Sequence, residues 1–247
     1  TLPGASGYEW SKIEDELAID HTVYTVDLLG CGRSDKSSIT YTNFVYVQMI
    51  SDFIKKIIGQ KTDVIASGFS GSFVTMACHN EKELFNKIML VNPPSLTQLK
   101  QMPNRKDRLL KAALEIPIFG TLVYHMIVSR DNINNLFIEK MYYNPFHVDN
   151  QMADAYYEAA HKGGYYTRFL YSSLAAKYIN INICHALKAL DNSIYIVEGE
   201  TEPNGKAVTD DYCASNPAIE VSVLKETKHL PHVEAPEAFL EQVKIFF

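Results

Sequence analysis

The stretch DVIASGFSGS, residues 63–72, runs from an apolar segment into a turn of glycine and serine. The apolar segment FVTMAC, residues 73–78, follows directly, so the order predicts a strand, a sharp turn and a helix. A serine at the tip of such a turn has a strained backbone and a hydroxyl that projects above the sheet. We therefore predict that Ser70 lies at this tip.

Small residues are expected two positions before and after the tip, because the flanking backbones nearly touch. Gly68 and Ser72 occupy these positions, and Ser72 departs from the glycine that is usual at the second one. A flexible turn that happens to contain serine would have the same five residues. The strand before the turn and the helix after it favour a functional serine.

The composition indicates one globular α/β domain. The chain has 247 residues, of which 47% are hydrophobic and 21% charged. The net charge of −6 gives no electrostatic reason to expect nucleic acid or an anionic membrane as a partner. The four cysteines are widely spread without a CxxC pair, which favours free thiols over a disulfide framework or a zinc site. Free thiols indicate a reducing compartment, so we expect a cytoplasmic location. No signal peptide and no apolar run of about 18 to 20 residues is visible.

Strands and helices alternate along most of the sequence. This pattern predicts a mostly parallel, doubly wound sheet that is covered on both faces. Ligands of such sheets bind beyond the carboxyl ends of the strands, where Ser70 is expected. The expected strands are residues 21–28, 64–66, 87–91, 193–197 and 219–224, and the expected helices are residues 8–18, 41–58, 73–78 and the segment after Pro236.

Between residues 97 and 178 the strand pattern stops and short helical segments rich in tyrosine and phenylalanine replace it. The sequence thus predicts a helical cap inserted between two parts of a core, residues 1–96 and 179–247. Most of these rings are expected to pack against one another. A cap in this place would cover the carboxyl ends of the strands and form a pocket that is poor in water.

A carboxylate and a histidine follow the last two expected strands. Glu202 lies in a turn after the strand at 193–197, where it could orient a histidine, and Glu200 is an alternative or an ordinary loop residue. His229 follows the strand at 219–224. The order serine, acid, histidine, with each residue just past a strand end, is the order of the α/β-hydrolases.

Five segments resemble conserved blocks of the α/β-hydrolase superfamily, in the branch of serine hydrolases with a helical cap after the sixth strand of the fold. They are VYTVDLLGCGRSDK (23–36), DVIASGFSGSF (63–73), KIMLVNPPS (87–95), IVEGETEP (196–203) and KHLPHVEAPEAF (228–239). The segments EIPIFGTLVYHMIVSR (115–130) and YYEAAHKGG (156–164) also resemble caps of bacterial and plant hydrolases of this branch. The resemblance implies that Ser70 is the nucleophile, His229 the general base and Glu202 the acid, in a position that usually holds aspartate. Asp210 and Asp211 are weaker alternatives for the acid.

The resemblance also implies about three strands upstream of Thr1, and the opening TLPG, which has no methionine, resembles the middle of a loop. We therefore expect the natural protein to have further residues at its N-terminus. One oxyanion donor is expected to be the backbone N–H of Gly71, and the other is expected from the loop upstream of this chain or from its remnant at Thr1 or Leu2.

These assignments predict transfer of an acyl group to Ser70 and then to water, with an apolar ester or thioester as substrate. A serine in place of aspartate argues against haloalkane dehalogenation and epoxide hydrolysis. The alternatives are carbon–carbon bond hydrolysis, a lyase or acyltransferase reaction with the same residues, and a ligand-binding protein without turnover. Phe69, Tyr124 and Tyr143 are candidates for the pocket lining; no cofactor or metal is expected, and the oligomeric state stays open.

Overall fold

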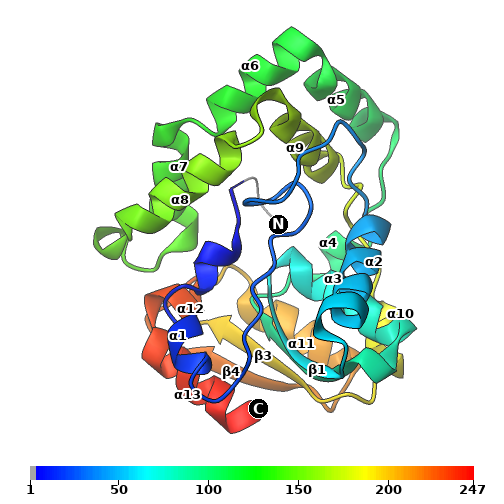
Figure 1. Ribbon diagram of the computed structural model, residues 1–247, viewed down its shortest axis with the longest axis vertical. Coiled ribbons are helices and arrows are strands. Elements are labelled where there is room, and N and C mark those ends of the chain that lie inside the picture. The colour runs from blue at the N-terminus through cyan, green and yellow to red at the C-terminus, as the bar shows by residue number, and fades with distance from the viewer. Residues whose placement is uncertain (1–3) are drawn as a thin grey trace. The chain divides into compact units, whose positions relative to one another are not determined.

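The computed structural model describes residues 4–247, which form two compact units (Figure 1). One unit joins the residues up to Thr42 with Met102–Ile179, and the other joins Asn43–Gln101 with Asn180–Phe247. The helical stretch that the sequence assigns to a cap therefore shares its unit with the N-terminal segment.

The second unit is built on a four-stranded parallel sheet in the order β1-β2-β3-β4. This arrangement confirms the predicted parallel α/β architecture. The register places Ala66 beside Leu90 and Leu90 beside Ile196, so three buried apolar side chains cross the middle of the sheet. The strands are β1 (Thr62–Ser67), β2 (Phe85–Val91), β3 (Ile194–Gly199) and β4 (Glu220–Leu224).

Helices cover both faces of this sheet, as the alternation of side chains along β3 shows. Tyr195 points to α13, where its hydroxyl donates to Gln242 at 2.8 Å and its ring stacks on Phe246. Glu198, on the opposite face of the strand, packs against Gly205 at the start of α11. The helices of this unit are α2 (Asn43–Phe53) with its continuation η2 (Ile54–Ile58), α3 (Phe69–Asn80), η3 (Lys82–Leu84), α4 (Leu96–Leu99), α10 (Cys184–Ala189), α11 (Gly205–Ser215), α12 (Pro231–Glu234) and α13 (Pro236–Phe246).

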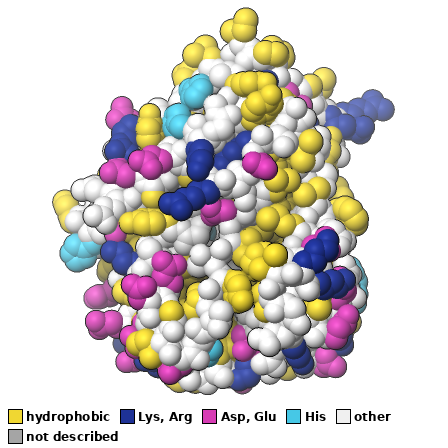
Figure 2. Space-filling view, viewed as in Figure 1, with side chains coloured by type: hydrophobic (Ala, Val, Ile, Leu, Met, Phe, Trp, Pro, Cys, Tyr) yellow, Lys and Arg dark blue, Asp and Glu magenta, His cyan; other side chains and the backbone are white. Residues whose placement is uncertain are grey.

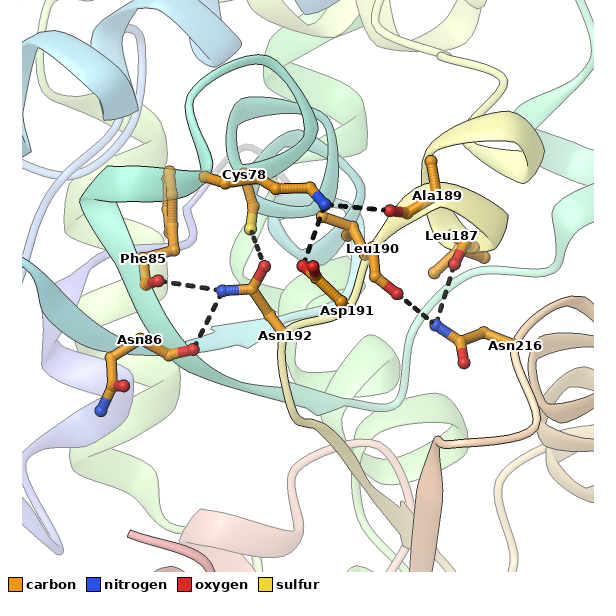
Figure 3. A network of polar contacts seen from close by, with 10 residues as sticks. Cys78, Phe85, Asn86, Leu187, Ala189, Leu190, Asp191, Asn192 and Asn216 are labelled. Atoms are coloured by element: carbon orange, nitrogen blue, oxygen red, sulfur yellow. Dashed lines mark hydrogen bonds and ion pairs between the residues drawn. The ribbon is translucent and has the colours of Figure 1, made fainter.

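The chain returns to the sheet at β3 only after the long helical stretch that follows β2. Side-chain amides hold the segment before β3 in place (Figure 3). Asn192 Nδ2 donates to the carbonyl oxygens of Phe85 (2.9 Å) and Asn86 (3.1 Å) at the start of β2. Its Oδ1 accepts from Cys78 Sγ at 3.4 Å. Asn216 Nδ2 closes the neighbouring loop on the carbonyl oxygen of Leu187 at 2.9 Å. These bonds satisfy backbone groups at the amino end of the sheet.

The first unit consists of helices and of the N-terminal segment that packs on them. Lys12 Nζ lies 2.8 Å from the Asp149 carboxylate, and the N–H of Tyr41 donates to Ser173 Oγ at 3.0 Å. The helices are η1 (Gly7–Trp10), α1 (Glu14–Leu17), α5 (Arg105–Glu115), α6 (Pro117–Ile127), α7 (Arg130–Leu136), η4 (Phe137–Met141), η5 (Pro145–His147), α8 (Asn150–His161), η6 (Gly164–Tyr166) and α9 (Thr167–Ala175).

The predicted strand at residues 21–28 is wrong. The segment forms no ladder with any strand in the described part of the chain, and Val23, Tyr24 and Val26 are exposed. Its alternating apolar pattern is typical of a strand, but a strand also needs a neighbour for its backbone hydrogen bonds. The helix expected at residues 8–18 is also interrupted, and the short turns η1 and α1 replace it.

Within residues 4–247, no single helix has the length and apolar composition to cross a membrane. The pair α5 and α6 meets the criterion only when both are counted together, and a bend of 95° separates them.

Candidate active site

The turn between β1 and α3 has its strained residue at Gly68. This residue has φ 55° and ψ −131°, follows the last residue of β1 and directly precedes α3. Its N–H donates to Val91 O at 2.9 Å, which holds the turn against the end of β2. A Cβ on Gly68 would meet nothing within 4 Å, so the positive φ, not lack of space, is what favours glycine.

The sequence predicts that Ser70 lies at the tip of the turn, but in the structure it does not. It is half-buried in the first turn of α3, two residues past Gly68, and it is not among the residues with positive φ. The helix begins at Phe69, so the strained conformation with positive φ falls on the residue without a side chain, where it costs least. Within the described residues, no hydrogen bond joins Ser70 to His229.

Ser72 is accommodated at the second small position because its hydroxyl is satisfied within the helix. The side chain is fully buried, and its Oγ donates to Phe69 O at 2.7 Å. Next to it, Gly71 is crowded, since a Cβ would lie 3.0 Å from Leu90 Cδ2. The close packing of α3 on the sheet therefore tolerates serine at position 72.

The backbone N–H of Gly71, the predicted oxyanion donor, is engaged, because it donates to Gly68 O at 3.1 Å. Phe69 is the first residue of α3, and among the described residues its N–H has no acceptor. Phe69 is therefore better placed than Gly71 to bind an anion. Leu2, the other predicted donor, lies outside the described residues.

Glu202 and His229 come together after the last two strands of the sheet. His229 Nδ1 lies 3.1 Å from Glu202 Oε1 and 3.3 Å from Oε2. A tight turn holds Glu202, since its N–H donates to Gly199 O and its carbonyl oxygen accepts from Gly205 N–H, both at 3.0 Å. Both side chains are partly open to solvent, at 29% for His229 and 21% for Glu202.

The other carboxylates proposed from the sequence do not contact this ring. Glu200 Oε2 accepts from the N–H of Glu226 at 3.0 Å, which closes the loop after β4. Asp210 and Asp211 are exposed on α11. Of the four acidic candidates, Glu202 alone bonds the imidazole in the described structure.

Asn92 ties the ends of two strands to the histidine loop, a role that the sequence does not reveal. Its Nδ2 donates to the carbonyl oxygens of Lys228 (2.8 Å) and His229 (2.9 Å), and its Oδ1 accepts from Gly199 N–H at 3.0 Å. The residue is buried and has φ 43°. A Cβ on Gly199 would lie 1.9 Å from Lys228 O, so this close approach also requires glycine.

Two further titratable groups near the dyad are buried. Burial raises the pKa of the Glu198 carboxyl, which lies on the α11 side of β3. Burial, followed by the charge of nearby His229, lowers the pKa of His232 from 6.5 to about 3. His232 packs beside Phe239, with 5.7 Å between the ring centroids, and stays neutral at physiological pH.

The candidates for the pocket lining have different environments. Tyr124 is fully buried, its hydroxyl donates to Ala160 O at 2.7 Å, and burial raises its pKa to about 12. The structure thus gives Tyr124 a packing role. Tyr143 is exposed in the same unit, while Phe69 is half-buried at the start of α3 in the other unit. In residues 4–247, no group of three or more histidine, cysteine or acidic side chains is arranged to hold a metal ion.

The sequence profile described as the Alpha/beta hydrolase family matches residues 1–242. The chain belongs to this family. In the family, the nucleophile stands on the strained turn from strand to helix, which is the conformation of Gly68 here. Comparison with curated protein sequences gives no significant match.

Solved structures of the family share the fold. The 2-hydroxy-6-oxo-6-phenylhexa-2,4-dienoate hydrolase from a Rhodococcus strain is 18% identical with a TM-score of 0.76, covering 100% of this chain and 87% of its own. An epoxide hydrolase is 15% identical with a TM-score of 0.78, covering 98% and 87%. A carboxylesterase from Bacillus subtilis is 15% identical with a TM-score of 0.73, covering 98% and 79%. At these identities the likeness establishes the fold, not the reaction.

Proposed function

We propose that the chain hydrolyses small esters or thioesters with an apolar acyl group, with Ser70 as nucleophile, His229 as general base and Glu202 as the acid that orients it. The hydrogen bond between Glu202 and His229 Nδ1 carries this proposal. An ionised carboxylate only accepts hydrogen bonds, so it favours the tautomer with the proton on Nδ1. Nε2 is then left with the lone pair that a general base needs.

In the proposed reaction, Ser70 Oγ attacks the substrate carbonyl and gives its proton to His229 Nε2. Glu202 stabilises the imidazolium that forms, and the Phe69 N–H at the start of α3 is the proposed donor to the oxyanion. The leaving group then takes the proton from Nε2. In the second step water gives a proton to Nε2 and attacks the acyl carbon, and Ser70 Oγ leaves and takes that proton.

The names of the similar structures suggest which activities to assay first. The names of three of them denote a carboxylesterase, a dienoate hydrolase and an epoxide hydrolase. A carboxylate nucleophile, which epoxide opening requires, is absent from residues 68–72, where only glycine, phenylalanine and serine occur. Ester hydrolysis is therefore the first activity to assay, and carbon–carbon cleavage of a dienoate is the second.

A specific observation favours a second function, the binding of a small molecule without an acyl-enzyme. The strained position of the turn holds Gly68, which has no side chain to act as a nucleophile, and Ser70 belongs to the helix. In this alternative, Ser70 acts as a small residue of the turn, and His229 and Glu202 bind the polar end of a ligand.

Hydrolysis of p-nitrophenyl esters of graded acyl length, by the wild type, Ser70→Ala and Gly68→Ser, separates the two functions. The hydrolase proposal predicts turnover by the wild type and a loss of about 10³-fold or more in Ser70→Ala. An inactive wild type together with an active Gly68→Ser would contradict Ser70 as the nucleophile and favour the binding function, because the substitution places a hydroxyl at the strained position. Circular dichroism of each variant shows whether it is folded.

A further inference from the structure

The helices α5 and α6 expose an unusual number of large apolar side chains at and near the elbow that joins them. Ile118 is 86% exposed and Leu109 is 72% exposed. In Figure 2, hydrophobic side chains gather at the top of the view, where Figure 1 draws the junction of α5 and α6. We call this surface the elbow patch; it consists of Leu109, Leu110, Ile116, Ile118, Phe119, Leu122 and Met126.

The apolar exposure follows one face of α6. Phe119, Leu122 and Met126 recur at intervals of three and four residues, which places them on a single side of the helix. Gly120 and Tyr124, on the opposite side, are buried. The sequence PIFGTLVYHMI of α6 contains no acidic residue, lysine or arginine, so no charge interrupts the exposed face.

The guanidinium of Arg168 is buried and holds the elbow between α5 and α6 by hydrogen bonds. Arg168 is buried, and it donates to Glu115 O at 3.2 Å, Thr121 Oγ1 at 3.3 Å and Tyr165 O at 2.6 Å. A Cβ on Gly120 would lie 1.8 Å from Leu114 O, so the two helices approach as closely as their backbones permit. The apolar side chains are thus presented by a rigid support.

Basic side chains border the apolar ones on α5. Arg105, Lys106 and Arg108 are exposed, and within residues 4–247 none of them forms an ion pair. The acidic residues of α5 are neutralised, since Asp107 pairs with Lys177 and Glu115 pairs with Lys111. The outward charge of α5 is therefore positive, although the whole chain carries −6.

We propose that the elbow patch docks on an anionic lipid surface, with the apolar side chains in the headgroup and acyl boundary and Arg105, Lys106 and Arg108 on the lipid phosphates and carboxylates. A large apolar face bordered by basic residues is the signature of helices that lie in a membrane interface. Each helix has 11 residues, so at 1.5 Å per residue it spans about 16 Å, well short of the roughly 30 Å hydrocarbon core. The bend of 95° also excludes a straight span, so the pair enters one leaflet only.

Charge favours lipid over a second copy of the chain as the occupant. A two-fold contact between two elbow patches would place the basic side chains of one α5 near those of the other. Such like charges oppose association unless acidic groups intervene, and α6 supplies none. An anionic bilayer instead has an apolar interior for the exposed apolar side chains and a negatively charged headgroup layer for the basic side chains of α5.

Flotation of the full chain with vesicles tests this inference. The vesicles consist of phosphatidylcholine alone, or of two parts phosphatidylcholine to one part phosphatidylserine. We expect binding to the mixed vesicles that weakens with salt, and much weaker binding to phosphatidylcholine alone. The triple variant Arg105→Gln, Lys106→Gln, Arg108→Gln should bind the mixed vesicles on the order of 100-fold less tightly, at about fivefold per basic residue.

The apolar part of the patch is tested by Ile118→Glu with Phe119→Glu, which should lower binding by at least about tenfold. Phe146→Glu is the matched control, because Phe146 is 93% exposed in the same unit but lies on η5, outside the patch. Equal binding by all variants, or no binding by a folded wild type, would overturn the inference. Light scattering measures the oligomeric state. If the wild type were a dimer and Ile118→Glu a monomer, the elbow patch would bind a second copy of the chain, and the lipid proposal would be wrong.

Discussion

At the scale of single residues, some polar side chains around His229 bond its imidazole ring, and others bond the backbone of the loop that carries it. Glu202 bonds Nδ1 of the ring, whereas Asn92 donates to the backbone carbonyl oxygens of Lys228 and His229. Glu200, two residues before Glu202, bonds only backbone. We therefore expect substitutions of Glu202, Asn92 and Glu200 to have different effects on activity and stability.

Glu202→Gln should lower kcat by about 10²- to 10⁴-fold, because the amide no longer fixes the tautomer or stabilises the imidazolium. The measurement is steady-state hydrolysis of the best ester from the panel. Glu200→Gln is the control, and it should keep kcat within about threefold, since its carboxylate accepts only a backbone N–H. If the two substitutions had equal effects, Glu202 would lose its proposed role.

Asn92→Ala should destabilise the fold by about 2–4 kcal/mol, because it leaves buried backbone groups of Gly199, Lys228 and His229 without their partner. It should also lower kcat more than it raises KM, since His229 is displaced while the remaining site is kept. Urea unfolding and ester kinetics measure the two effects. A variant with wild-type stability and wild-type kcat would show that Asn92 does not position the histidine.

At the scale of elements, the sequence predicts the sheet well and the turn after β1 less well. The four strands from Thr62 onward are found within about two residues of their predicted bounds, because buried parallel strands have continuous apolar runs. The tip of the turn is misplaced by two residues. The stretch ASGFSGS (66–72) has small residues two before and two after both Gly68 and Ser70, so it fits a turn centred on either residue, and only the backbone dihedrals separate these alternatives.

Gly68→Ala tests the assignment of the strained tip. Its ψ of −131° lies outside the left-handed helical region, so alanine there should cost about 2–3 kcal/mol. Gly59→Ala is the matched comparison, because Gly59 has φ 71° and ψ 8° and also has open space around its Cα. Alanine at position 59 should cost about 1 kcal/mol. Equal losses in urea unfolding would mean that Gly68 is not specially strained.

At the scale of the whole molecule, net charge is a poor guide to what the surface can bind. The value of −6 argues against an anionic partner, yet the structure separates the basic residues of α5 from their acidic neighbours. The failed strand at residues 21–28 has a related cause. Both features depend on which residues become neighbours in three dimensions, and local sequence does not contain that information.

Stability should fall in acid because of His232. In the unfolded chain this histidine takes up a proton below its ordinary pKa of 6.5, whereas in the folded protein burial keeps it neutral to about 3. Between these values the unfolded state binds one more proton, so the free energy of unfolding falls by about 1.4 kcal/mol per unit as pH is lowered. Urea unfolding from pH 7 to pH 4 measures the slope. His232→Gln should reduce the slope by that amount, whatever its constant effect on stability, and an unchanged slope would contradict the buried neutral histidine.

The most direct test of the proposed acyl-enzyme is the reaction of the folded chain with a fluorophosphonate, followed by intact-mass and peptide mass spectrometry. The hydrolase proposal predicts one adduct per chain, located on Ser70, and its absence in Ser70→Ala and strong slowing in Glu202→Gln. No adduct on the folded wild type, together with an adduct on residue 68 of Gly68→Ser, would contradict the hydrolase proposal. That result would establish that the turn keeps the geometry of the family without its nucleophile.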